Sequence, residues 1–406
     1  MPKTKKFIPL QSQRQDDEKS ETHQLAKLLV TTGILESPDA LVPLAISQSV
    51  DSFLLHRLAE TQTNLQDYTQ IQTLKTNTRD NMVLHLIQER AMLTVNQALT
   101  QANINCIWLN GKALGYTVYP EPHLRVTDTV ECIIAPDNMP SVVKLLQSIG
   151  YYQPDSAHDS YHQSVQLYHR QHAQLRLVLH EQLKGYSGRA LISDERLAQW
   201  FDDPLQFKVK EQNLITLQPE HHLLYLCANG FLHDGQSIIG LHDLLDLHLL
   251  LTTVDLNWDG LIAEAVELQW TYLVAYVFDV VCDYFDTPIS TDVLAALHKQ
   301  NKADQFMRRI VLNYHDDSQA ESVFQYMGQL GIRDKIKTAV QIFFPPKRYI
   351  RQRYSIRAKR ATAPYYVYRI LSYLITMPII IIRRVLSLLK RAFRRRNQSN
   401  NALKRS

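Results

Sequence analysis

The chain has 406 residues, of which 45% are apolar and 21% are charged. This composition is typical of a globular protein and excludes collagen-like and wholly disordered classes, while the length predicts two or three folding units. The four cysteines form no C-x-x-C pair and have no partner histidine at zinc spacing. A disulfide scaffold and a zinc ribbon are therefore excluded, and a reducing compartment is favoured.

Positive and negative charges are segregated along the chain. Nineteen of the 44 Lys and Arg residues follow Asp334, where no Asp or Glu occurs, so the first 334 residues carry 25 basic and 40 acidic side chains. This asymmetry indicates a polyanionic partner, either a membrane surface or a nucleic acid.

The N-terminal part of the chain is predicted to be helical after a short leader. Residues 1–20 are polar, charged and aperiodic, which predicts disorder, and they lack the apolar run of a secretory signal peptide. Residues 21–102 carry apolar residues three and four positions apart, which is typical of helices. The longest apolar stripe includes Met82, Met92 and Val95.

Residues 103–218 are predicted to form a small α/β core with about four strands. The strands are expected at 104–109, 129–135, 164–169 and 174–180, and the helices at 111–119 and 138–149. Apolar residues recur at every second position of the later strands, as Val165 and Leu167 illustrate. Residues 219–334 return to a helical pattern, and residues 335–406 form a basic amphipathic tail. The chain is therefore predicted to have an α+β fold, with a mixed-sheet core between helical N- and C-terminal regions.

The order strand, glycine turn, helix and carboxylate-bearing strand indicates phosphate and metal chemistry. A glycine lets backbone N–H groups approach phosphate oxygens, and carboxylates at i and i+2 of a strand can share a divalent cation. In this chain the glycine is Gly111, followed by Lys112, and the carboxylates are Asp128 and Glu131.

These motifs resemble those of the uncharacterised bacterial nucleotidyltransferase-like proteins, over roughly residues 100–330. The matching positions in the core are Gly111, Leu114, Tyr119, Pro120, Arg125, Ile133, Ile134, Gly150, Tyr151 and His180. The matching positions in the helical region are 219–226, His233 and 241–244.

The resemblance implies a nucleotidyltransferase-like core that uses Mg2+ and a nucleoside triphosphate (NTP). It assigns Glu131 to the metal and Arg125 to a phosphate. Asp128, which lies near Glu131 in the sequence, is expected to help hold the metal, and these three are the candidate catalytic residues. The candidate nucleotide-binding residues are Gly111, Lys112, His180 and His233. Arg125, His180 and His233 are expected to meet in a cleft between the core and the helical region.

The chain also departs from the family pattern at its metal ligands. Thr129 occupies the first carboxylate position and Glu131 the second, while Val178 or Leu179 stands where a third is expected. Asn110 replaces the lysine that precedes the glycine.

Asp128 could join Glu131 on a metal only across a bulge, because residues i and i+3 of a regular strand point to opposite faces. Two functions therefore remain open. One is nucleotidyl transfer from an NTP to an unknown acceptor with reduced activity, and the other is a catalytically degenerate binding or scaffold protein.

The basic tail is predicted to attach to an anionic membrane. Its apolar run, residues 370–382, spans 13 residues and contains Pro378, which is short of the roughly 20 residues of a spanning helix. An interfacial anchor over residues 347–396 fits this pattern and predicts a cytoplasmic protein peripheral to the inner face of the membrane. The alternatives are a helix packed on the acidic body and, less favoured, nucleic-acid binding.

Overall fold

A computed structural model describes residues 16–31, 41–61, 70–154, 158–159, 164–182, 192–232, 240–268, 270–298 and 363–367 of the chain. Contacts divide the chain into two compact units, Met1–His315 and Asp316–Ser406. In the second unit the described residues are 363–367, which are helical. All elements named below belong to the first unit.

Four helices precede the sheet, as the periodicity of residues 21–102 predicts. They are α1 (Asp16–Val30), α2 (Val42–Ser47), α3 (Asp51–Thr61) and α4 (Ile71–Gln101). The predicted apolar stripe of α4 is partly wrong, because Met82 is 45% exposed whereas His85 and Glu89 are buried. His85 and Glu89 have partners on the next helix of the chain, described below.

The described residues contain one mixed sheet. Its strands are β1 (Cys106–Leu109), β2 (Thr129–Ile134), β3 (Tyr151–Tyr152), β4 (His158–Asp159), β5 (Ser164–His169), β6 (Arg176–His180), β7 (Leu205–Val209) and β8 (Gln212–Thr216). Their order is β3-β5-β6-β2-β1-β8-β7, and β4 pairs with β5. Strand β2 lies antiparallel to β1 and parallel to β6, in regular register.

The sheet is larger than the sequence predicts. The four expected strands are confirmed as β1, β2, β5 and β6. The hairpin β7–β8 extends the sheet beyond β1, since β8 pairs parallel to β1 through Trp108 and Thr216. The expected number of about four strands is therefore wrong for the described residues.

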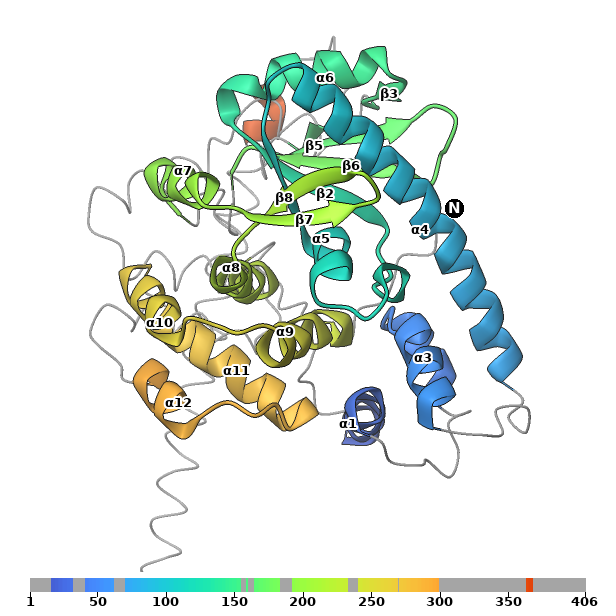
Figure 1. Cartoon of the computed structure of the whole chain (residues 1–406), viewed down its shortest axis with the longest axis vertical. Helices are drawn as coiled ribbons and strands as arrows, with labels where there is room; N and C mark the ends of the chain where they lie inside the picture. The colour runs from blue at the N-terminus through green and yellow to red at the C-terminus, as the bar shows by residue number, and fades with distance from the viewer. Residues whose placement is uncertain are drawn as a thin grey trace, which may run out of the picture. The chain divides into compact units, whose positions relative to one another are not determined.

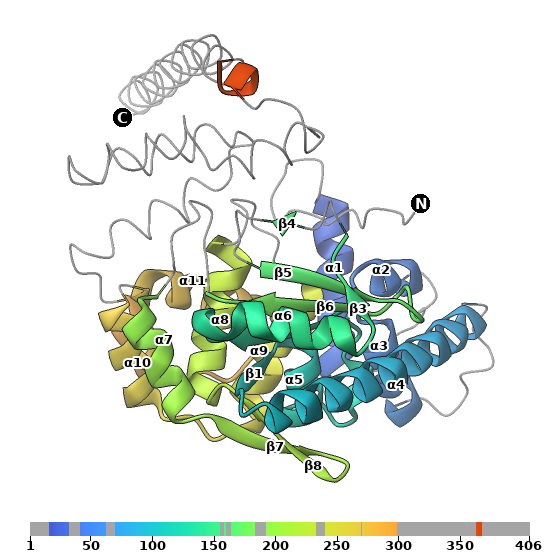
Figure 2. The same cartoon turned by 90° about the horizontal axis from the view of Figure 1, so that it is seen from above.

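Helices fill the connections and cover both faces of the sheet. They are α5 (Asn110–Thr117), α6 (Met139–Ser148), α7 (Asp194–Asp202), α8 (Pro219–Leu232), α9 (Leu241–Thr253), α10 (Trp258–Glu267), α11 (Thr271–Phe285) and α12 (Thr291–His298). Short 3-10 turns lie at Pro122–Leu124 and Pro136–Asn138. Helices α8 to α12 gather on one side of the molecule, and α4 runs along the sheet (Figures 1 and 2).

Alternate residues of the sheet enter two separate hydrophobic cores. Cys132 and Ile134 pack with residues of α4 and α6, whereas Ile133 packs with residues of α8, α9 and α11. This alternation defines two faces of β2, and Thr129 and Glu131 belong to the same face as Ile133. The α+β fold with helical flanks is confirmed.

Candidate functional site

The candidate site is the face of the sheet on which Glu131 stands. Register pairs Glu131 with Leu109 of β1 and with Val178 of β6, and it pairs Ile133 with His180. Residues paired across neighbouring strands project from the same face, so Glu131, Val178 and His180 are neighbours. Val178, rather than Leu179, therefore occupies the place next to Glu131 where a third carboxylate is expected.

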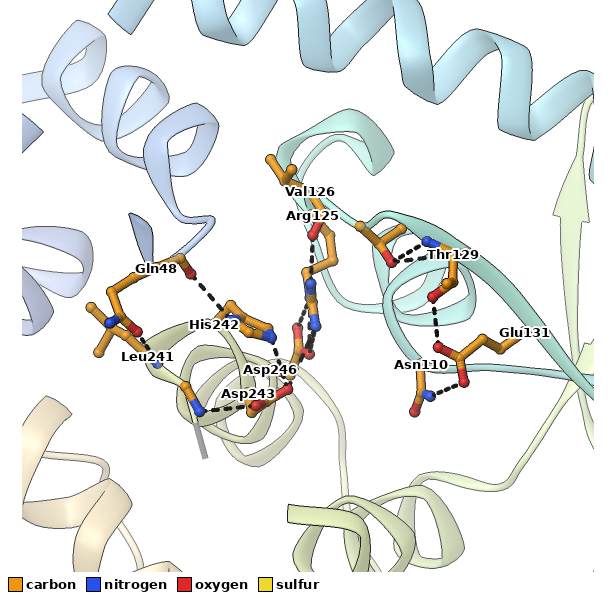
Figure 3. Close-up of polar contacts among 12 residues, drawn as sticks. Gln48, Asn110, Arg125, Val126, Thr129, Glu131, Leu241, His242, Asp243 and Asp246 are labelled. Carbon is orange, nitrogen blue, oxygen red and sulfur yellow. Dashed lines mark hydrogen bonds and ion pairs between the residues drawn. The ribbon is translucent and has the colours of Figure 1, made fainter. Parts of the chain in front are cut away.

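Both carboxylate oxygens of Glu131 accept hydrogen bonds. Thr129 Oγ1 donates to Oε1 at 2.7 Å, and Asn110 Nδ2 donates to Oε2 at 2.8 Å (Figure 3). His180 Nε2 lies 3.0 Å from Oε2. These three groups come from the β1–α5 junction, from β2 and from β6, and they hold the carboxylate in one orientation.

The same contacts keep Glu131 ionised. Burial alone raises the pKa of this carboxyl group, but the hydrogen bonds from His180, Thr129 and Asn110 outweigh burial and lower the pKa to about 2. Glu131 is therefore a negatively charged acceptor at neutral pH. Hydrogen bonds from amide, hydroxyl and imidazole groups stabilise its charge.

Asn110 has an unusual backbone that aims its side chain at this cluster. Its φ angle is 54°, in the left-handed region that asparagine tolerates better than most residues. Its Nδ2 also lies 3.4 Å from the hydroxyl group of Tyr225 on α8. Within the described residues, the buried Oδ1 of Asn110 has no hydrogen-bond partner. An acceptor buried in this way costs free energy unless a bound molecule donates to it.

Asp128 lies outside the strand that carries Glu131. Strand β2 begins at Thr129 and keeps its register through Ile133, so no bulge brings Asp128 onto the face of Glu131. Asp128 is exposed. In the part of the chain that the structure describes, no group of three or more His, Cys, Asp or Glu side chains could hold a metal ion.

The residues present therefore do not fit a divalent cation. Glu131 is the only carboxylate that β2 presents on the site face, and it is already bonded to three side-chain donors. A metal site of the family type needs several oxygen ligands that converge on one point. The predicted pairing of Asp128 with Glu131 on a metal is corrected accordingly.

Arg125 is buried in an ion pair with Asp246 of α9. Its Nε lies 2.7 Å from Oδ1 and its Nη2 lies 2.7 Å from Oδ2 (Figure 3). Tyr119 donates its hydroxyl to the same Oδ1 at 2.7 Å. Asp246 is 0% exposed and Arg125 is 7% exposed. The remaining Nη1 donates to the carbonyl of Val126. This placement argues against the predicted phosphate contact, because the guanidinium group instead joins the core to α9.

The position of Arg125 accounts for the presence of a glycine at position 111. A Cβ atom at Gly111 would lie 3.0 Å from Cβ of Thr127 and 3.4 Å from Cζ of Arg125. The missing side chain therefore makes room for the guanidinium group, as a close approach requires. The predicted phosphate-binding role of Gly111 has no further support from its surroundings.

Lys112 points away from the site face. It is 2% exposed, and its Nζ lies 3.0 Å from Nδ1 of His85 on α4. On the same side of α5, Tyr116 donates to Glu89 at 2.5 Å, and Lys210 also pairs with Glu89. Burial lowers the pKa of Lys112 to about 7. The predicted nucleotide contact of Lys112 is corrected, because its ammonium group is enclosed between α4 and α5.

The start of α9 is tied to the N-terminal helices. The backbone N–H of Leu241 donates to Oε1 of Gln48, and Nδ1 of His242 lies 3.1 Å from the carbonyl of Gln48. Asp243 accepts from the backbone N–H of Gly240 at 3.0 Å, which closes the first turn. The Leu241–Leu244 motif therefore serves helix placement. His233, the other predicted site residue of the helical region, lies outside the described residues.

The comparisons place the chain in a family. A family model described as uncharacterised nucleotidyltransferase matches residues 36–286. The chain is a member of this nucleotidyltransferase family. A comparison with curated proteins found no significant match.

Membership of this family bears on the role of strand β2. In the family pattern, this strand carries the metal ligands. In this chain β2 presents Thr129 and Glu131 on one face, as the sequence predicts. Two residues of the site region were not among the predicted site residues. Tyr225 lies in the matching segment 219–226 but was not singled out there. Asp246 stands among the leucines of α9, where a lone acidic residue in an apolar run was the available signal.

Proposed function

We propose that this chain is a binding protein that keeps the nucleotidyltransferase fold without metal-dependent nucleotidyl transfer. The observation that carries the proposal is the state of Glu131, whose two oxygens accept from Thr129, Asn110 and His180. Side-chain donors thus occupy the positions that a cation would need.

The loss of neighbouring carboxylates supports the same conclusion. Thr129 and Val178 lie beside Glu131 on the site face, so one negative charge remains where several would converge. Nucleotidyl transfer depends on cations that neutralise triphosphate charge, and a single satisfied carboxylate supplies too little to recruit them. Two cations of the core, Arg125 and Lys112, are buried against Asp246 and His85.

What the site retains is suited to binding. Asn110 offers an unpartnered acceptor, and His180 and Thr129 hold Glu131 in a fixed orientation beside it. A rigid polar arrangement of this kind can orient a ligand by hydrogen bonds without changing it chemically.

The proposal is tested by calorimetric titration of ATP and GTP into the full chain, with and without Mg2+. We expect no binding that requires Mg2+, and we expect Glu131→Gln to give the same result as the wild type. Mg2+-dependent binding that disappears in Glu131→Gln would show that Glu131 recruits a cation and would contradict the proposal.

We also propose that the basic tail holds the protein on the cytoplasmic face of an anionic membrane. The support is the charge segregation of the sequence, with 19 basic and no acidic residues after Asp334. Each basic residue near an anionic surface contributes about 1 kcal/mol. No helix in the described ranges combines the length and apolar character needed to cross a bilayer.

The full chain is expected to sediment with phosphatidylglycerol vesicles at low salt and to be released at high salt, because salt screens the attraction. Phosphatidylcholine vesicles are the control and should bind little of it. A variant with Arg394, Arg395 and Arg396 changed to Gln should bind more weakly. Binding to RNA in place of both vesicle types would favour the nucleic-acid alternative.

A further inference from the structure

A row of side chains crosses four neighbouring strands on the site face, next to the row that contains Glu131. Register pairs Tyr152 of β3 with Tyr168 of β5, Tyr168 with Arg176 of β6, and Arg176 with Thr129 of β2. The strands β3, β5 and β6 lie side by side at one end of the sheet (Figure 2). Since strands are about 4.8 Å apart, Tyr152 and Arg176 are separated by about 10 Å.

The row faces away from the core that lies under α4 and α6. The chain neighbours of the row residues, which alternate with them, are buried in that core; they are Tyr151, Leu167, Leu177 and Val130. Tyr152 is 40% exposed, and Tyr168 and Arg176 are half-buried. The row is therefore a partly accessible strip of polar and aromatic groups.

Arg176 differs from Arg125 in its surroundings. Within the described part of the chain, its guanidinium group makes no hydrogen bond or ion pair, whereas Arg125 is held by Asp246. Glu131 stands in the adjacent row, but its oxygens are bonded to Asn110, Thr129 and His180. A half-buried cation loses hydration without compensation, so an anion bound there would be stabilised.

The two tyrosines supply a surface for a ring beside this cation. Their ring centroids are 6.2 Å apart with an interplanar angle of 38°. Such a tilted pair leaves ring faces and edges on which another ring can stack. Because Tyr168 is the direct register neighbour of Arg176, one small molecule can contact both.

We propose that Tyr152, Tyr168 and Arg176 bind a small phosphorylated ring compound without a metal ion. Arg176 pairs with the phosphate, and the tyrosines stack on the ring. This site lies on β3, β5 and β6, apart from the region between Gly111 and Glu131 to which the resemblance assigns the nucleotide. This inference rests on the proposed function, because it requires a fold that binds its ligand without a metal ion.

The test is calorimetry of the full chain with EDTA present, using AMP, ribose 5-phosphate and inorganic phosphate. We expect AMP or ribose 5-phosphate to bind more tightly than inorganic phosphate. A preference for AMP identifies an aromatic ring, and equal binding of AMP and ribose 5-phosphate identifies the sugar. Arg176→Gln should weaken binding about tenfold or more, because hydrogen bonds to charged groups are strong.

Matched controls separate this site from the basic tail. Arg170→Gln removes the same charge from the exposed turn between β5 and β6 and should leave affinity unchanged. Tyr168→Leu should abolish the preference over inorganic phosphate, and Tyr168→Phe should keep it. Arg176→Lys, which keeps the charge, should retain more affinity than Arg176→Gln. Circular dichroism checks that each variant is folded.

Two results would overturn the inference. One is equal affinity of the wild type and Arg176→Gln for all three compounds. The other is equal wild-type affinity for AMP, ribose 5-phosphate and inorganic phosphate. Failure of the proposed function has a different signature, since binding would then require Mg2+ and would be lost in Glu131→Gln rather than in Arg176→Gln.

Discussion

Asp246→Ala is expected to lower the free energy of unfolding by about 3–5 kcal/mol, because it leaves a buried guanidinium group without its counter-charge. Arg125 contributes two nitrogens to this pair, and Tyr119 adds a third hydrogen bond to the same carboxylate. Asp246 is fully buried, so water cannot replace the lost partner. Urea denaturation followed by far-UV circular dichroism measures the change.

Two further variants test whether burial of the ion pair causes this loss of stability. The double variant Arg125→Met/Asp246→Leu should recover much of the loss, since well-packed apolar residues can replace a buried ion pair. Glu211→Ala breaks an exposed pair with Lys208 and should cost less than about 1 kcal/mol. A loss below 1 kcal/mol in Asp246→Ala would contradict the assignment of this pair as the join between the core and α9.

Lys112→Met is expected to stabilise the protein at pH 7 and to lose this advantage toward pH 10. Burial lowers the pKa of Lys112 from 10.5 to about 7, with Arg125 adding to the effect and Glu89 opposing it. Between these values the unfolded state binds a proton that the folded state lacks. Stability of the wild type therefore rises with pH, by up to about 1.4 kcal/mol per unit from this group.

The difference in unfolding free energy between the wild type and Lys112→Met isolates the contribution of Lys112 from those of other titrating groups. At each pH from 6 to 10, the unfolding free energies of the two proteins are compared. The advantage of Lys112→Met should be largest below pH 7, where the folded wild type must carry a buried charge beside His85. Lys208→Met, which removes the same charge at an exposed position, is the control for the substitution itself. A constant difference across the range would mean that Lys112 is not desolvated in the folded protein.

Much of the fold could be predicted because it depends on local patterns. Alternating apolar residues identified β5 and β6, and a glycine after an amphipathic run marked the end of α6. The hairpin β7–β8 shows the same alternation in Leu205–Val209, where Phe207 and Val209 are buried, but it was overlooked. Its parallel pairing with β1 joins residues about a hundred positions apart, which no local pattern contains.

The candidate site was predictable only where it lies on one strand. The i and i+2 spacing of Thr129 and Glu131 placed them on one face, and their hydrogen bond agrees with this. The roles of Arg125 and Lys112 depend on partners in α9 and α4, which a basic residue near a glycine does not reveal. For the same reason, the buried face of α4 was misread, since His85 and Glu89 turn inward toward Lys112 and Tyr116.

The most direct test of the claim that this fold lacks metal chemistry is a titration of MgATP. It is carried out with the wild type and with the double variant Thr129→Asp/Val178→Asp. This double substitution adds two carboxylates beside Glu131 on the site face. One stands two residues earlier on β2, and the other stands at the position of β6 that pairs with Glu131. We expect no Mg2+-dependent binding in the wild type and a gain of such binding in the double variant. Mg2+-dependent binding by the wild type, lost in Glu131→Gln, would contradict the claim.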